Sequence, residues 1–179
     1  MSSLRIASRY AKALFRLADG DLAKAEKQAT ALDTIQELFA MEESARILRS
    51  PVMPAELKRE LLKLALDRVG ASPDLRNFTN ALIGAGRLAM LPQVGEAYRL
   101  LLDAARGVLH AEVSSAVELG GAEVGAIQSA LKNMLRKEIK IAQRIDKNLL
   151  GGFEVRIGNM LVDMSVRTKL DALAAQALA

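Results

Sequence analysis

The chain has no cysteine, which excludes a disulfide framework and any metal site built from thiolates. It has no tryptophan either, and aromatic residues make up only 3% of the sequence although 51% of the residues are hydrophobic. The interior must therefore be built mainly from Ala, Leu, Ile, Val and Met. That composition favours helices over strands.

A long apolar segment is also missing. No apolar run approaches the roughly 20 residues that a helix needs to cross a bilayer. The first residues carry an early arginine but not the apolar core of a signal peptide, and they do not resemble a long transit sequence. We therefore expect a soluble protein that is made in the compartment where it works. A chain of 179 residues can form one domain with a sizeable core or two small domains.

Side chains that carry out chemistry are scarce. The single histidine, His110, lies on the polar side of a predicted strand without a fixed nucleophile, so we favour an inert surface role. The ligand clusters that zinc or a transition metal requires are not found in the sequence. Two glycine pairs, Gly120-Gly121 and Gly151-Gly152, occur without a phosphate-binding motif and indicate turns or hinges. We predict no catalytic residue, no metal and no cofactor, and a hydrolase that depends on His110 ranks lowest.

The net charge of +4 and the pI near 9.5 raise the question of nucleic acid. The densest basic cluster, 132–140, holds four basic residues with a glutamate among them, and we favour a solvated helix face. An RNA-binding sheet needs stacking aromatic side chains, and Phe153 is the one aromatic residue after residue 107. A nucleic-acid-binding adaptor that uses the C-terminal part of the chain remains the alternative function.

Helical spacing of apolar residues dominates the first part of the chain. Ser50-Pro51 ends one helix, because the residue before proline is pushed out of the helical conformation. Ser72, Pro73 and Asp74 together start another helix. We predict an antiparallel six-helix bundle over residues 1–106, with helices at 3–18, 22–39, 42–49, 54–70, 72–85 and 88–107.

The first of these helices has an unusually wide apolar surface. Its polar residues form one stripe at spacings of three and four, namely Arg5, Arg9, Lys12, Arg16 and Asp19. The apolar remainder covers about twice the 100° face that packing on one core requires. Two explanations fit equally well: the helix lies centrally in its own bundle, or it borders a groove that accepts a helix from a partner.

Strand periodicity replaces helical periodicity after Gly107. Apolar and polar residues alternate over 109–119 and 139–145, and a helix with apolar spacing lies between them at 124–135. Phe153, Val155 and Ile157 begin a hairpin that turns at Gly158-Asn159 and returns over 160–162. Asp163 and Ser165 offer an N-cap to a last helix, 165–177. We predict a small α+β domain over 107–179 with the order β-α-β-β-β-α, in a chain that is mainly α.

Four segments, in order along the whole chain, carry a family resemblance. They are 7–15 (Ala-Ser-Arg-Tyr-Ala-Lys-Ala-Leu-Phe), Asn77-Phe78 leading into Gly86-Arg87-Leu88, Val113-Ser114-Ser115-Ala116, and 146–167, with Asp-x-x-Leu-Leu-Gly-Gly, Val-Arg-x-Gly and Asp-x-Ser-Val-Arg. The chain resembles the δ subunit of bacterial F-type ATP synthase, the family of the mitochondrial oligomycin-sensitivity-conferring protein.

The resemblance implies a function in the stator of a rotary proton-translocating ATP synthase. In this family the N-terminal bundle binds N-terminal helices of the α subunits on the catalytic head, and the C-terminal domain binds the C-terminal region of the b-subunit stalk. We therefore expect a non-catalytic connector that works in ATP synthesis and proton transport. Its expected location is peripheral, at the cytoplasmic face of the bacterial plasma membrane, with no direct membrane contact and no nucleic acid partner.

For the partner-binding groove we select residues on the first helix and on the helix after Ser72. They are Tyr10, Ala13, Leu14, Leu17, Phe78, Ala81 and Leu82. Small residues at Ala13 and Ala81 let a partner backbone approach, while Tyr10 and Phe78 supply apolar area at low entropic cost. The alternative for Leu14 or Leu82 is a place in the core of the bundle.

Overall fold

The computed structural model describes residues 2–168 and 170. Within them the chain is mainly helical and carries a small four-stranded sheet, which confirms the prediction of a mainly α chain. Contacts between backbone segments divide the chain into two compact units, Met1–Arg106 and Gly107–Ala179. Each unit has a hydrophobic core of its own.

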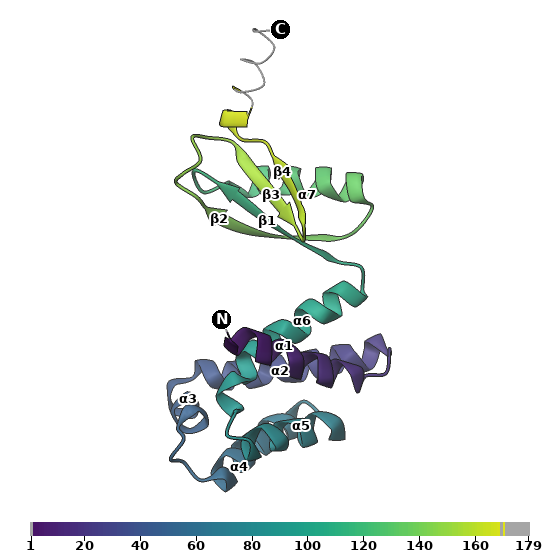
Figure 1. Ribbon diagram of the computed structural model, residues 1–179. Coiled ribbons are helices and arrows are strands. Elements are labelled where there is room, and N and C mark those ends of the chain that lie inside the picture. The colour runs from purple at the N-terminus through teal and green to yellow at the C-terminus, as the bar shows by residue number, and fades with distance from the viewer. Residues whose placement is uncertain (1, 169, 171–179) are drawn as a thin grey trace. The chain divides into compact units, whose positions relative to one another are not determined.

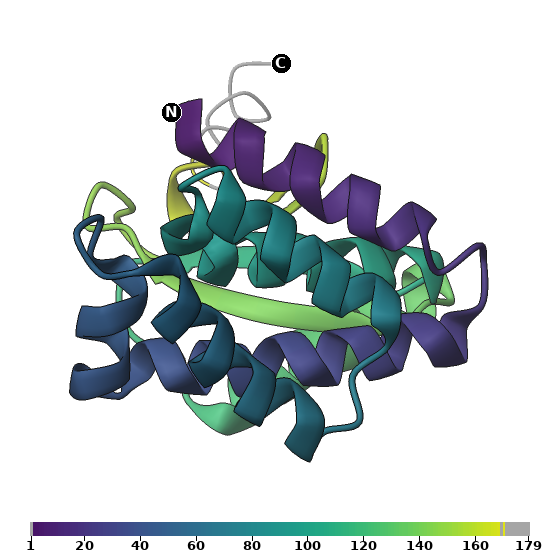
Figure 2. The same ribbon diagram turned by 90° about the horizontal axis from the view of Figure 1, so that it is seen from below.

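Helices build the first unit. They are α1 Ser2–Arg16, α2 Leu22–Ala40, α3 Glu42–Arg49, α4 Ala55–Arg68, α5 Pro73–Gly84, the 3-10 helix η1 Leu88–Met90, and α6 Leu91–Ala105. α6 contacts both α1 and α2, which lie on either side of it (Figures 1 and 2). The helix predicted over 88–107 is interrupted, because Pro92 has no N–H to donate to Leu88 and α6 starts only at Leu91.

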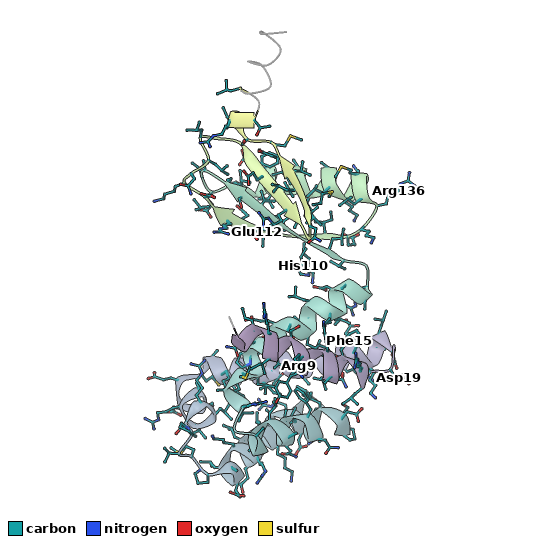
Figure 3. All side chains as sticks on the ribbon, viewed as in Figure 1. Arg9, Phe15, Asp19, His110, Glu112 and Arg136 are labelled. Carbon is teal, nitrogen blue, oxygen red and sulfur yellow. The ribbon has the colours of Figure 1, made fainter. Side chains whose placement is uncertain are left out.

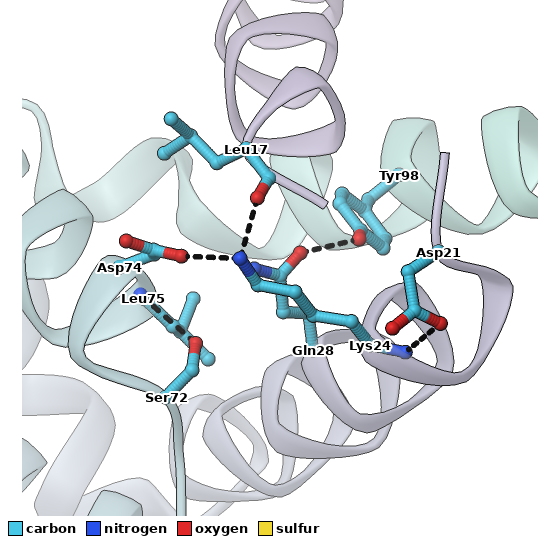
Figure 4. Close-up of polar contacts among 8 residues, drawn as sticks. All are labelled: Leu17, Asp21, Lys24, Gln28, Ser72, Asp74, Leu75 and Tyr98. Carbon is cyan, nitrogen blue, oxygen red and sulfur yellow. Dashed lines mark hydrogen bonds and ion pairs between the residues drawn. The ribbon is translucent and has the colours of Figure 1, made fainter. Parts of the chain in front are cut away.

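The core of the first unit is centred on Tyr98 of α6, which is fully buried. Its ring packs edge-to-face on Phe15 of α1, with centroids 5.5 Å apart. Its hydroxyl donates a hydrogen bond to Gln28 Oε1 over 2.6 Å (Figure 4). The same hydroxyl lies 3.3 Å from the carbonyl oxygen of Ala25. This buried polar contact joins α6 to α2.

The second unit contains one sheet, the helix α7 and, at 166–168, the start of a further helical turn. The strands are β1 Leu109–Ser115, β2 Ile139–Ile145, β3 Phe153–Ile157 and β4 Met160–Asp163, and the helix is α7 Gly121–Leu135. The strand order is β2-β1-β3-β4, with β1 and β2 parallel and the other two pairs antiparallel. α7 lies along the sheet (Figure 1). Its buried Leu131 shares a core with Val113 and Val155. Most of the helix predicted over 165–177 lies outside the described residues.

The Gly151-Gly152 pair holds the end of β4 against the start of β3. Gly152 has a φ of +76°, and a Cβ there would lie 2.5 Å from the carbonyl oxygen of Met164. On either side the Met164 N–H donates to Phe153 O over 2.9 Å, and the Val166 N–H donates to Gly151 O over 3.0 Å. Gly152 therefore combines a backbone conformation that favours glycine with a close approach of a neighbouring strand end.

The predicted cap after β4 is present. The Ser165 Oγ accepts from the Thr168 N–H over 3.3 Å, and the Asp163 carboxylate accepts from the Thr168 hydroxyl over 2.6 Å and from the Ser165 N–H over 2.8 Å. The hydrogen bond from Thr168, followed by those from Ser165, lowers the pKa of the Asp163 carboxyl. The chain leaving the sheet therefore starts a helical turn in a defined direction.

Candidate partner-binding surface

The side chains of residues 5–18, from α1 and the turn that follows it, form three parallel stripes. Each stripe repeats at spacings of four, three and four, and neighbouring stripes are offset by one residue, or about 100° around the helix. The stripes are a fully buried one (Ala7, Ala11, Leu14, Ala18), a basic one (Arg5, Arg9, Lys12, Arg16), and an apolar one that is only partly covered (Ile6, Tyr10, Ala13, Leu17). One part of the wide apolar surface of α1 therefore packs in the core of the bundle, and the other part faces outward.

The apolar residues of α5 are also divided between a buried side and an outward side. Leu75 and Leu82 are buried in the core, while Phe78 is half-buried and Ala81 is exposed. α5 contacts α1, so the outward apolar residues of the two helices are neighbours. We call the five residues Tyr10, Ala13, Leu17, Phe78 and Ala81 the α1–α5 surface.

Two of the residues selected from the sequence lie elsewhere. Leu14 is 0% exposed and Leu82 is 1% exposed, because each occupies the stripe of its helix that faces the bundle core. Neither side chain is accessible to a partner. The prediction that Leu14 and Leu82 contact the partner is therefore corrected: both pack in the core of the bundle. Leu17, by contrast, is 47% exposed.

Tyr10 and Phe78 form the centre of the α1–α5 surface. Their rings meet edge-to-face, with centroids 6.2 Å apart at 71°, and both keep part of their area exposed. The Arg87 guanidinium donates a hydrogen bond to the Tyr10 hydroxyl over 2.6 Å and lies 5.9 Å from the centre of its ring. The two rings are therefore held in place without being sealed in the interior.

Arg87 had no role assigned from the sequence. It is 77 positions away from Tyr10, and no local spacing rule connects residues so far apart. The only available signal was the Gly86-Arg87-Leu88 segment of the family resemblance. Its contact with Tyr10 makes it a positioning residue for the α1–α5 surface.

Lys24 of α2 holds α1 and α5 together at the Leu17 end of the α1–α5 surface. Its ammonium donates to the carbonyl oxygen of Leu17, just after α1, over 2.7 Å. It also pairs with the Asp74 carboxylate, in the first turn of α5, over 2.8 Å (Figure 4). One cation therefore connects three helices next to the exposed Leu17 side chain.

The basic stripe lies next to the outward apolar stripe, one residue along the chain. Within the described part of the chain, none of Arg5, Arg9, Lys12 and Arg16 has an acidic partner. An apolar surface flanked by unpaired positive charge is complementary to a helix that is apolar on one side and acidic beside it.

The residues considered for chemistry do not form a site. His110 is exposed on β1 (Figure 3), and the described residues contain no group of three His, Cys, Asp or Glu side chains that could hold a metal ion. None of the described helices is both long and apolar enough to span a bilayer.

The open face of the sheet does not suit nucleic acid. Glu112 and Glu154 lie among Arg144 and Arg156 on this face, and Arg144 pairs with Glu112 over 3.4 Å. Phe153 lies on the opposite face, which α7 covers. The sheet therefore presents mixed charge in place of the stacking side chains that an RNA-binding sheet uses.

Comparisons with known proteins agree on one family. The family model described as ATP synthase delta (OSCP) subunit matches residues 6–177. The chain is 35% identical to the ATP synthase subunit delta of Oleidesulfovibrio alaskensis, over 93% of this chain and 92% of that one. It is 37% identical to the subunit delta of Parvibaculum lavamentivorans, over 94% and 87%.

A solved structure has the same fold. The chain is similar to a chain in the Toxoplasma gondii mitochondrial ATP synthase hexamer, with a TM-score of 0.63 and coverage of 97% of both chains. The sequence identity in this comparison is 24%, so the likeness concerns the fold.

Proposed function

This chain belongs to the ATP synthase delta (OSCP) subunit family, and we propose that it is the stator connector between the catalytic head and the peripheral stalk. It is a structural subunit, with no catalytic site of its own. The rotor applies torque to the head, so the head turns with the rotor unless a tether holds it. The connector must therefore bind firmly at both of its ends.

We assign one end of the tether to each unit. Residues 1–106 act as a six-helix bundle that binds the N-terminal helices of the α subunits. Residues 107–179 act as a β-α-β-β-β-α domain that binds the C-terminal region of the b subunit. The protein then reaches the cytoplasmic face of the bacterial plasma membrane only through the complex.

The α1–α5 surface is the observation that carries the head-binding assignment. Tyr10 and Phe78 offer fixed aromatic area, and Ala13 and Ala81 leave room beside it for a partner backbone. The flanking basic stripe favours a partner helix with acidic residues beside its apolar face. These are the features of a helix-in-groove interface with aromatic anchors.

Titration with a peptide of the α-subunit N-terminal helix tests this assignment. Tyr10→Asp should weaken binding to the full chain by more than about 2 kcal/mol, or about 30-fold, as expected for the loss of an aromatic anchor. Ala81→Arg should weaken binding similarly without removing any packing contact, because Ala81 is exposed.

Asn80→Arg is the matched control for these variants. Asn80 is exposed on the same helix, about 100° away from Ala81, so its substitution should leave the affinity unchanged. Wild-type affinity in both Tyr10→Asp and Ala81→Arg would remove the α1–α5 surface from the interface. A pull-down from detergent-solubilised membranes, probed for α and b chains, tests the tether as a whole.

A further inference from the structure

The second unit contains an apolar cavity of about 540 Å³ between α7 and the strands β3 and β4. Its floor includes Val155 and Val162, which lie opposite each other on the two strands. One wall is the side of α7 that carries Ala126 and Ala130. We call this cavity the α7–β3–β4 cavity.

The cavity exists because the layer between α7 and the sheet is incomplete on one side. Gln128 of α7 donates a hydrogen bond to the carbonyl oxygen of Ile139 over 2.6 Å and holds the helix toward β2. On the side toward β3 and β4, Ala126 and Ala130 are small and remain exposed. Phe153 and Val162 are consequently only half-buried.

The volume of the cavity suits a small molecule. Sites for small ligands have about 300–1,000 Å³, and the α7–β3–β4 cavity lies within this range. Its lining along α7 runs from Glu123 to Met134, which at 1.5 Å per residue is about 16 Å. A helix of this length and about 10 Å diameter occupies about 1,200 Å³, so more than half of it would lie outside the cavity. An elongated small molecule fits inside.

Glu123 is the one charged residue in the lining. Its Oε2 accepts a hydrogen bond from the Gly120 N–H over 2.8 Å, and its Oε1 has no partner within the described residues. A full negative charge exceeds the roughly half positive charge of the helix N-terminus beside it. The cavity therefore offers one free anionic oxygen in an apolar surrounding, which is complementary to a cation.

The free carboxylate oxygen lies at one end of the cavity. Glu123 is in the first turn of α7, and α7 starts six residues after the end of β1 at Ser115. Ser115 pairs with Phe153, whose carbonyl oxygen accepts from the Met164 N–H over 2.9 Å. The ring of Phe153 and the thioether of Met164 therefore line the same end as Glu123, where an aromatic ring also favours a cation.

The opposite end of the cavity offers no partner to an anion. Met134 lines this end and is 59% exposed. Arg136 and Lys137, which follow it, border a separate hollow together with Lys132 and Glu138 and do not line the cavity. The charge inside the cavity is thus only negative and is confined to the Glu123 end.

We propose that the α7–β3–β4 cavity is a binding site for an elongated apolar amine. Its ammonium pairs with Glu123, and its apolar chain lies along α7 toward Met134. The flexible side chains of Met134 and Met164 adjust to the shape of the chain. The proposal does not depend on the stator function and concerns the second unit alone.

Titration calorimetry of the full chain with three ligands of equal chain length tests the proposal. The ligands are decylamine, decanol and decanoate, each below its micelle concentration. Decylamine should bind at least about fivefold more tightly than decanol, as expected for one partly exposed ion pair, and decanoate should bind most weakly. Equal affinities for the three ligands, or no binding of decylamine, would overturn the proposal.

Glu123→Gln should remove the preference for decylamine over decanol. Glutamine still accepts from the Gly120 N–H, so the start of α7 is kept. Glu118→Gln is the matched control, because Glu118 is exposed, lies close in the chain and does not line the cavity. A preference that persists in Glu123→Gln would show that the carboxylate does not hold the ammonium.

A blocking substitution locates the apolar chain. Ala130→Trp should reduce the affinity for both decylamine and decanol by about tenfold or more, because the indole fills the cavity. Ser129→Trp adds the same side chain outside the cavity and should bind as wild type. Both positions are exposed, so thermal unfolding should be unchanged. Wild-type affinity in Ala130→Trp would place the ligand elsewhere and contradict the proposal.

Methionine oxidation gives an independent readout. Hydrogen peroxide converts an exposed thioether to a sulfoxide and is itself reduced to water. Decylamine should protect Met134 and Met164, while Met41, which is 57% exposed in the first unit, should be oxidised at the same rate with and without it. Equal oxidation of Met134 and Met164 in both samples would contradict binding in the cavity. Protection without ligand that rises with protein concentration would identify a second copy of the chain as the occupant instead.

Discussion

Among single residues, Tyr98 combines complete burial with a titratable hydroxyl. Gln28 is 1% exposed and depends on that hydroxyl, because its Nε2 has no hydrogen-bond partner within the described residues. Its Oε1 accepts from Tyr98 over 2.6 Å. Removing the hydroxyl therefore leaves two buried polar atoms of one amide unpaired.

Tyr98→Phe should lower the free energy of unfolding of the first unit by about 1–3 kcal/mol, the cost of an unpaired buried polar group. Denaturant unfolding followed by circular dichroism measures this. Phe keeps the ring that packs on Phe15, so a loss of helix content in native buffer would contradict a purely polar effect. Unchanged stability would show that the contact with Gln28 contributes nothing.

Alkaline pH should weaken the same contact. Burial raises the pKa of Tyr98 to about 12, above its ordinary value near 10, because the phenolate would lose its hydration. A group whose pKa is higher in the folded state stabilises the fold only while it stays protonated. For Tyr98 this stabilisation is complete below about pH 10, the pKa of the unfolded chain, and is lost as the pH rises from about 10 to about 12. The stability of Tyr98→Phe should vary less over this interval, and parallel pH profiles for the two proteins would contradict the assignment.

At the scale of elements, two mid-helix glycines should respond oppositely to the same substitution. A Cβ added at Gly125 in α7 would have open space around it, with no neighbouring side chain within 4 Å, while a Cβ at Gly95 in α6 would lie 2.6 Å from Gln36 Nε2. That amide nitrogen donates to the carbonyl oxygen of Pro92 over 2.9 Å. Gly125 has room for a methyl group. At Gly95 the space that a side chain would occupy is filled by Gln36, which forms a contact between helices.

Gly125→Ala should raise the free energy of unfolding by about 0.5–1 kcal/mol, because alanine loses less backbone entropy in a helix. Gly95→Ala should gain nothing or lose stability, since the gain in propensity is offset by the displaced Gln36 hydrogen bond, itself worth about 1 kcal/mol. Thermal unfolding of both variants against wild type measures the difference. Equal stabilisation by the two substitutions would contradict the role of Gln36.

Most elements could be predicted from residue spacing, because helical and strand periodicities report which positions share a face. What spacing cannot show is which of two apolar stripes faces the core. Leu14 and Leu17 are equally apolar and lie close together in the chain, yet one is buried and the other half-exposed. The difference is set by α6, which packs on one side of α1 only, and the contact of Arg87 with Tyr10 likewise depends on tertiary packing.

At the scale of the whole molecule, each unit has a separate core, so damage to one should spare the function of the other. Gly152 is the most sensitive point of the second unit, because a Cβ there meets backbone atoms of Met164 and Ser165 that cannot move independently of β4. Its positive φ adds to the strain on any other residue.

Gly152→Ala should destabilise the second unit by more than about 2 kcal/mol, from the unfavourable φ and the backbone clash together. Binding of the b-subunit peptide should fall, while binding of the α-subunit peptide should stay at the wild-type level. Gly158→Ala is a useful comparison, because its φ is also positive but no atom lies within 4 Å of an added Cβ. Equal losses in the two variants would show that the clash with Met164 is unimportant.

The ammonium of Lys24 holds the carbonyl of Leu17, just after α1, and the first turn of α5 at the same time. In the tether that we propose, tension that enters through a partner helix on Tyr10 and Phe78 is therefore shared by α1, α2 and α5. We expect α1 in this tether to resist the load together with its neighbours and not to unfold turn by turn from its carboxyl end.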